Sequence, residues 1–96
     1  MTPEQIELAR HALGLPNKRH LSYRNHFVAA EGHPDYINWC EMVEAGEARG
    51  RIGSELTGGD PVFWLTLAGA SLALRQGEHL NMDDFKRPGQ QEKPDA

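Results

Sequence analysis

The sequence predicts an α+β fold with three or more helices and a two-stranded β-hairpin before the last main helix. The segment from Pro61 to Gly77 provides the first observation, because four β-branched, aromatic or branched apolar residues follow a Gly-Gly-Asp-Pro turn and lead directly into an Ala/Leu-rich stretch. Residues 3–13 and 34–45 provide two more, since each repeats apolar residues at helical spacing behind a proline that suits a first helical position.

Length and charge limit the classes of function that the chain can have. Its 96 residues predict one domain, to which we assign residues 1–85, and the charged, proline-bearing residues 86–96 are expected to form a disordered tail. The formal net charge of −4 repels polyanions, so nucleic-acid binding would need a local basic patch. A single cysteine excludes an internal disulfide framework, and no apolar run reaches the roughly eighteen residues of a membrane span. We therefore expect a cytoplasmic protein that does not bind membranes.

The first helix is predicted from Pro3 to Leu13. Thr2 is a good N-cap, and Gln5 stands three residues later as its capping-box partner. Gly14, followed by a leucine and a proline, has the position of a C-terminal capping glycine.

Residues 17–33 hold the only basic concentration in the chain, and their secondary structure is ambiguous. The spacing of four between Tyr23 and Phe27 slightly favours a helix over a strand. The second helix is predicted to begin at Pro34, behind His33, and to end near Ala45.

Helical periodicity divides the second helix into two faces. An apolar face is expected to pack on the core, and the opposite face is expected to point into solvent. The inward residues are Tyr36, Trp39, Cys40 and Val43, and the outward residues are Asn38, Glu41, Met42 and Ala45.

A hairpin and a third helix follow. Glu47–Leu56 predicts a weak first arm because it contains two glycines, and Val62–Leu65 returns as the second arm, with Phe63 and Leu65 facing inward and Trp64 outward. Thr66 then caps a helix that is expected to run to Gly77. The small residues of this helix allow close packing, and Leu67, Leu72 and Leu74 are expected to supply its apolar contacts.

This order of elements resembles a winged-helix domain. In that superfamily a helix ending in a leucine-valine-x-x-glycine pattern precedes the wing, and the second wing strand ends in an aromatic-x-leucine-threonine-x-x-glycine run. Residues 42–46 resemble the first pattern, and the second is matched by Phe63, Leu65, Thr66 and Gly69. The resemblance covers about residues 34–77. It departs between Gly14 and His33, where DNA-reading winged helices usually have a full helix-turn-helix.

The chain is also similar to small phage and prophage proteins, most of which have no assigned activity. The likeness lies in the TPEQ start, in the segment from Tyr23 to Phe27 and in the run from Thr66 to Gly69. It implies an origin rather than a mechanism.

Two sets of residues are candidates for binding. Arginine offers a planar fork of donors and lysine a point charge, so the basic segment can bind phosphate, carboxylate or an acidic surface, whereas the outer face of the second helix is acidic. Candidate partner-binding residues are Lys18, Arg19, Arg24, Asn25, His26, Asn38, Glu41, Met42, Glu44 and Trp64. Arg49 and Arg51 in the hairpin are the candidates for nucleic-acid contact.

Metal binding and catalysis have weaker support. His20, His26, His33 and Cys40 are six or seven residues apart, whereas structural zinc ligands usually come in close pairs, so no metal or other cofactor is expected. Neither Cys40 nor Ser71 lies in a nucleophile signature, so no enzyme activity is expected.

The sequence thus predicts a non-enzymatic, acidic binding module that docks on a protein. The phage resemblance implies an accessory protein acting on a host or phage protein, including the inhibition of a nucleic-acid-binding machine. The alternative is a winged-helix transcriptional regulator that binds DNA. Direct reading of the major groove is disfavoured because the outer face of the second helix has no Arg, Lys or Gln. The protein is expected to be a monomer or a small homo-oligomer.

Overall fold

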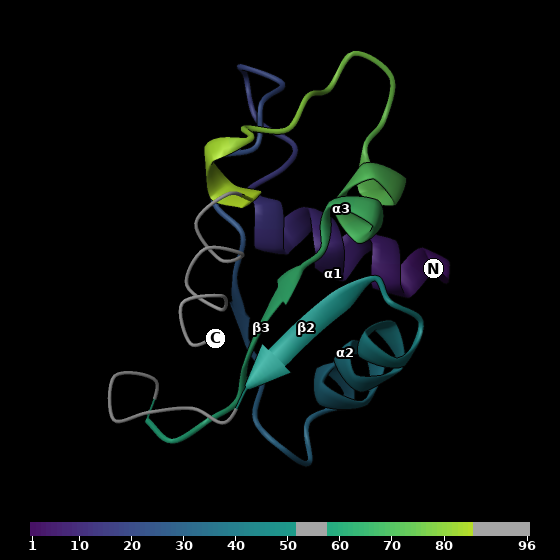
Figure 1. Ribbon diagram of the computed structural model, residues 1–96, viewed down its shortest axis with the longest axis vertical. Coiled ribbons are helices and arrows are strands. Elements are labelled where there is room, and N and C mark those ends of the chain that lie inside the picture. Colours follow the sequence, from purple (N-terminus) through teal and green to yellow (C-terminus); the bar gives the residue numbers. More distant parts are fainter. Residues whose placement is uncertain (52–57, 86–96) are drawn as a thin grey trace, which may run out of the picture.

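The computed structural model describes residues 1–51 and 58–85 and has an α+β architecture (Figure 1). In chain order its elements are α1 (Pro3–Leu13), β1 (Phe27–Val28), α2 (Pro34–Glu44), β2 (Ala48–Arg51), β3 (Val62–Leu65) and α3 (Leu67–Ala73). A further helical turn occupies residues 83–85. Helix α1 packs beside α3, and α2 lies beside β2. Within the described ranges, no helix has both the length and the apolar character needed to cross a bilayer.

The three strands form an antiparallel sheet in the order β1-β3-β2. The predicted hairpin is present in β2 and β3, where Ala48 pairs with Leu65 and Arg51 with Val62. The rest of its first arm, from residue 52, and the predicted tail at 86–96 lie outside the described residues. In β3 the predicted alternation is confirmed, since Phe63 and Leu65 are buried.

The slight preference for a helix around Tyr23–Phe27 was wrong, because this segment is extended and ends in β1. Its geometry is set by a long-range contact. The side chain of Asn25 accepts a hydrogen bond from the backbone N–H of Leu65 at 2.8 Å and donates to the carbonyl of Leu65 at 3.0 Å. Asn25 thus pairs with β3 much as another strand would, which keeps the chain extended.

Local signals placed the helix starts correctly. Thr2 and Gln5 form the predicted capping box, with both hydrogen bonds at 3.0–3.1 Å, and Gly14 ends α1 in the left-handed conformation. The side chain of His33 caps α2 by accepting from the N–H of Asp35 at 3.1 Å. These ends are determined by residues within one turn, which explains why they could be read from sequence.

Trp39 links α2 to the sheet. Its fully buried ring lies 5.4 Å from the ring of Phe27 in β1 and 5.6 Å from that of Phe63 in β3, the latter nearly parallel at 17°. One side chain therefore holds three segments together.

The predicted faces of α2 were partly wrong. Met42, expected to face outward, is fully buried, and Val43, expected to face inward, is 37% exposed. The cause is α1, which packs against α2 and donates from the side-chain amide of Gln5 to Asn38 and Glu41. Because α1 covers this side, the buried face of α2 is centred on Trp39 and Met42. Helical periodicity had placed it around the apolar residues Tyr36, Trp39, Cys40 and Val43.

Helix α3 approaches the rest of the molecule through its small residues. A Cβ at Gly69 would lie 1.9 Å from the carbonyl oxygen of Glu47, so backbone touches backbone there. Leu67 and Leu72 are 46% and 55% exposed, so the expectation that they supply packing contacts was wrong, and the buried contacts come from Ala70 and Ala73.

Helix α3 also ends earlier than predicted, at Ala73 rather than near Gly77. Leu74 is extended, and the N–H of Arg75 donates to a carboxylate oxygen of Glu78 at 2.7 Å. This turn brings Glu78 back to Arg10, a residue that no pattern in the sequence marks as buried. Arg10 is 1% exposed and donates from Nη2 to Glu78 at 2.7 Å and from Nη1 to the carbonyl of Ala73 at 2.9 Å. The hydrogen bond from Arg10 lowers the pKa of Glu78 to about 2.

Gly69→Ala tests the close approach of α3. Helix propensity alone predicts that alanine stabilises a helix interior by about 0.5–1 kcal/mol. The clash with Glu47 predicts the opposite sign, a destabilisation of about 1–3 kcal/mol. Urea unfolding measures the difference, with Ser71→Ala on the exposed side of the same helix as control. A Gly69→Ala protein as stable as the wild type would contradict the described packing.

Glu78→Gln tests the buried ion pair, whose loss leaves Arg10 unpaired and is expected to cost about 3 kcal/mol or more. In the wild type the folded pKa lies below the ordinary value of 4.5, so the stabilisation is complete above about pH 4.5 and is lost as the pH falls towards 2. The free energy of unfolding, measured between about pH 4.5 and 2, should fall in the wild type and fall less in the Glu78→Gln variant. Glu7→Gln, which breaks the exposed pair with Arg75, is the control and should cost less than about 1 kcal/mol. Equal effects of the two substitutions would refute the assignment.

Candidate functional site

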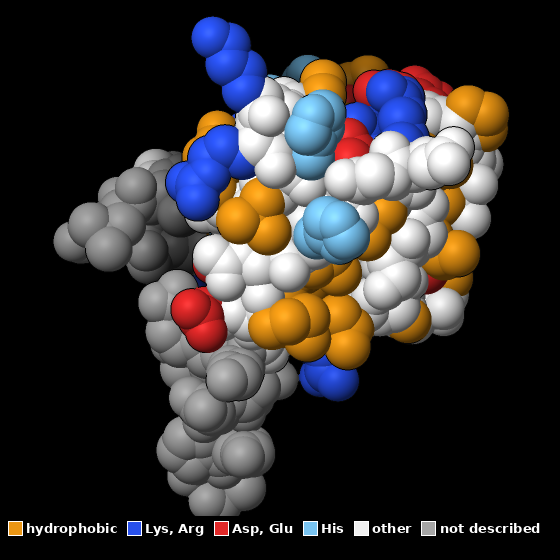
Figure 2. Space-filling model, turned by 90° about the horizontal axis from the view of Figure 1, so that it is seen from above, with side chains coloured by type: hydrophobic (Ala, Val, Ile, Leu, Met, Phe, Trp, Pro, Cys, Tyr) orange, Lys and Arg blue, Asp and Glu red, His pale blue; other side chains and the backbone are white. Residues whose placement is uncertain are grey.

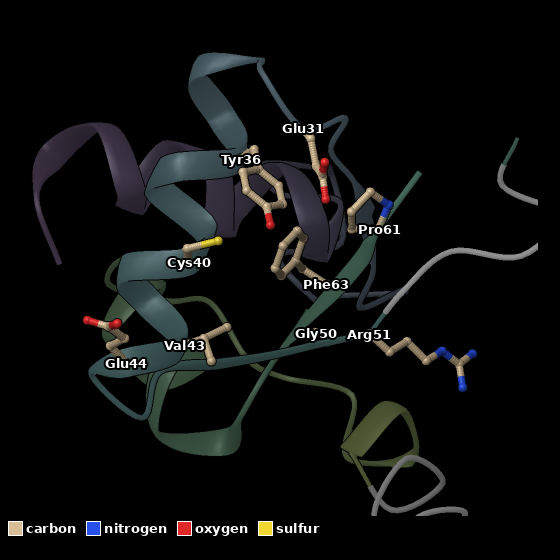
Figure 3. A pocket seen from close by; sticks show the side chains of 9 residues that line it. All are labelled: Glu31, Tyr36, Cys40, Val43, Glu44, Gly50, Arg51, Pro61 and Phe63. Atoms are coloured by element: carbon tan, nitrogen blue, oxygen red, sulfur yellow. The ribbon is translucent and has the colours of Figure 1, made fainter. Parts of the chain in front are cut away.

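A groove of about 370 Å³ lies between α2 and the strands β2 and β3 (Figure 3). Helix α2 supplies one wall with Tyr36, Cys40 and Val43. Phe63 and Gly50 supply the strand side, and Glu31, Glu44, Arg51 and Pro61 complete the lining.

The floor of the groove is apolar. The ring of Phe63 is only 5% exposed, and the ring of Tyr36 meets it edge to face at 5.9 Å. Gly50 lies next to it in β2, where a Cβ would come within 2.6 Å of the Phe63 ring. Glycine therefore lets β2 lie against the ring, and the groove depends on this residue for its shape.

The α2 wall is partly exposed and largely apolar. Val43 is 37% exposed, while Cys40 and Tyr36 are half-buried. The sulfur of Cys40 and the hydroxyl of Tyr36 both point towards the groove in Figure 3. A hydrogen bond with Cys40 raises the pKa of Tyr36, so the tyrosine stays neutral and acts as an amphipathic contact.

Carboxylates border this apolar surface. Glu31 and Glu44 are exposed and line the groove, and Asp35 and Glu41 lie on the same helix as Glu44. Helix α2 contains no Lys or Arg. Arg51 extends away from the groove in Figure 3, and its guanidinium lies 5.8 Å from the centre of the Trp64 ring. The groove is therefore an apolar hollow with an acidic border.

The structure leaves some of the predicted partner-binding residues on α2 accessible to a partner and buries or occupies others. Met42 is removed from the set, because a fully buried side chain cannot contact a partner. Asn38 and Glu41 both accept hydrogen bonds from Gln5, at 3.2 and 3.0 Å, which gives them a structural role. Glu44 remains exposed and lies at the groove. Tyr36 and Val43 were missed as site residues because periodicity assigned them to the core.

The basic segment lies at other hollows. Lys18 and Arg19 are exposed and line a separate hollow with Tyr23, whereas Arg24 and His26 line another with His11. Asn25 has the structural role described above. Lys, Arg and His side chains stand among apolar ones on the end of the molecule shown in Figure 2.

The remaining candidates are on the strands. Trp64 is half-buried beneath Arg51, on the opposite face of β3 from Phe63, as its alternation predicted. Arg49 is exposed and opposite Trp64 in the strand register.

Among residues 1–51 and 58–85, no three His, Cys, Asp or Glu side chains are grouped so that they could hold a metal ion. Comparison of the chain with protein-family models, curated proteins and solved structures finds no match.

Proposed function

We propose that the protein is a non-enzymatic docking module that binds a basic protein surface through the groove between α2 and β2–β3. An apolar side chain of the partner enters the groove, and Lys or Arg residues beside it meet the carboxylates of α2 and Glu31. The observation that carries this proposal is the partly exposed apolar wall of Val43, Cys40 and Tyr36 on a helix whose only charged side chains are acidic.

The size of the groove suits an anchoring side chain. Its volume of about 370 Å³ lies at the lower end of the range of about 300–1,000 Å³ for small-molecule pockets. One large aliphatic or aromatic side chain with part of its backbone fills such a space. Contacts of this kind, desolvated at the centre of an interface, carry most of the binding free energy between proteins.

The charges select the partner. Complementary charge at the edge of an interface raises the association rate and excludes partners of like charge. Proteins that bind nucleic acids expose Lys and Arg for the phosphate backbone, so their surfaces fit this groove and its border. The resemblance to phage and prophage proteins agrees with an accessory role on such a host or phage protein in the cytoplasm.

A winged-helix DNA-binding regulator is the second candidate. The order α2, β2, β3, with the Thr66-capped α3 behind it, supports a winged-helix assignment, and Arg49 and Arg51 lie on the strand that would enter the wing. Helix α2, the recognition element in such a domain, presents carboxylates that repel phosphate. We therefore place this function second.

Val43→Thr tests the apolar contact. The substitution keeps the shape of the side chain and adds a hydroxyl, so binding of a partner captured from a bacterial lysate should weaken about fivefold or more, as expected for an apolar contact worth about 1 kcal/mol. Val28→Thr is the matched control, because Val28 is a valine of similar exposure, 41%, outside the groove. Calorimetry measures both affinities. Equal losses, or none, would contradict docking in the groove.

Charge reversal at Glu31 and Glu44 separates the two candidate functions. Lysine at both positions brings the net charge from −4 to zero and should weaken partner binding at least about tenfold, because basic residues of the partner are now repelled. Duplex DNA binding by the wild type, measured by fluorescence anisotropy at moderate salt, should be undetectable. Tight DNA binding by the wild type would instead support the regulator. A partner that proves to be a second copy of the chain would contradict the docking of a basic protein.

A further inference from the structure

The hollow at Arg24 and His26 has a volume of about 210 Å³ and lies where the segment after Tyr23 crosses the C-terminal end of α1. It is lined by His11, Arg24, His26, Phe27 and Val28. Its polar lining consists of two imidazoles and a guanidinium, which donate through nitrogen, and no Asp or Glu of residues 1–51 and 58–85 lines it. It shares no residue with the groove on α2.

The carbonyl groups at the end of α1 are already occupied. The oxygen of Leu13 accepts from the N–H of Tyr23 at 3.1 Å, and that of Ala12 accepts from the N–H of His26 at 3.3 Å. The oxygen of His11 accepts from Arg24, at 2.7 Å from Nη2 and 3.3 Å from Nε. The partial negative charge of a helix C-terminus is thereby offset, so an anion approaching here meets donors rather than open carbonyls.

Arg24 is held in place without a carboxylate. Two nitrogens of Arg24 donate hydrogen bonds to the carbonyl oxygen of His11. The guanidinium of Arg24 lies 5.2 Å from the centre of the Tyr23 ring. By contrast, Arg10 and Arg75 pair with Glu78 and Glu7. Within residues 1–51 and 58–85, no acidic side chain pairs with Arg24, and Nη1 is not used in its bonds to His11.

The imidazoles come from two different elements. His11 belongs to the last turn of α1, and its ring meets that of Phe27 edge to face at 5.4 Å and 69°. His26 precedes β1 and is exposed, and its backbone is fixed by the bond to Ala12. Two imidazoles and a guanidinium are thus positioned around one hollow by backbone and ring contacts.

We propose that this hollow is a binding site for a small oxyanion, the carboxylate or phosphate group of a ligand. Arg24 offers its remaining donors to the anion, and the ring nitrogens of His11 and His26 donate beside it. Phe27 and Val28 contact the apolar atoms that carry the charged group. This site is independent of the proposed docking groove and binds the opposite charge.

The test is an NMR titration of the full chain with inorganic phosphate and, separately, with acetate. Sodium chloride at equal ionic strength is the reference, and the histidine ring signals and the amides of residues 24–28 are followed. Saturable shifts confined to this site are expected with at least one anion. The anion that binds with the higher affinity, phosphate or acetate, shows whether the natural ligand bears a phosphate or a carboxylate.

Arg24→Gln should weaken binding at least about fivefold, because a charge-assisted fork is lost. Arg75→Gln is the matched control, since it removes the same charge from an exposed position outside this hollow and should change affinity less than about twofold. His26→Gln is a second test, needed in case the Arg24 variant fails to fold. The ring of His26 makes no bond that the fold needs among the described residues. This substitution should therefore weaken anion binding while the rest of the spectrum stays unchanged. Shifts that match those in chloride, or equal losses in the Arg75 and Arg24 variants, would overturn the proposal.

Discussion

The burial of Trp39 between Phe27 and Phe63 is the contact on which the arrangement of this protein depends. The three rings join α2 to the outer strand β1 and to the central strand β3, with distances of 5.4 and 5.6 Å between ring centroids. The indole Nε1 is buried without an acceptor among the described residues, a cost of about 1–3 kcal/mol that the aromatic packing has to outweigh. Trp39 also determines which flank of α2 remains uncovered. With Trp39 and Met42 turned to the core, Tyr36, Cys40 and Val43 are left along the groove.

Polar contacts fix the rest of the molecule around this centre. Asn25 pairs with the backbone of Leu65 and so attaches the segment before β1 to β3. Arg10 reaches across 68 residues to Glu78 and fixes the chain beyond α3 against α1. A domain of this size buries only about 60–65% of its unfolded surface, so these polar links supplement a small apolar core. A separate polar link, from Arg24 to the carbonyl oxygen of His11 at the end of α1, lies at the hollow proposed for oxyanion binding.

Sequence reasoning succeeded where neighbouring residues determine the structure. Thr2 with Gln5, His33 and Thr66 all cap helices through atoms two or three residues away, and the alternation of Phe63 and Leu65 follows from strand geometry. It failed where a distant segment decides. Nothing near Met42 reveals that α1 packs against α2, and nothing near Tyr23 reveals that Asn25 pairs with Leu65.

The same limit applies to the candidate site. The acidic surface of α2 could be predicted, because Glu41 falls on its outer face by periodicity and Asp35 and Glu44 flank that face. The groove could not be predicted. It depends on which face α2 turns to the core and on the contact of Gly50 in β2 with Phe63 in β3. Arg10 and Glu78 had no visible signal, because an arginine on a helix is ordinarily exposed.

Docking in the groove can be measured directly with a defined probe. The probe is a short peptide with one leucine flanked by lysines, added to isotope-labelled protein while backbone amide shifts are recorded. Docking in the groove predicts saturable changes at Tyr36, Cys40, Val43, Gly50 and Phe63, with little change at residues 24–28. Saturation without changes at the groove, or changes centred on the end of α1, would contradict it.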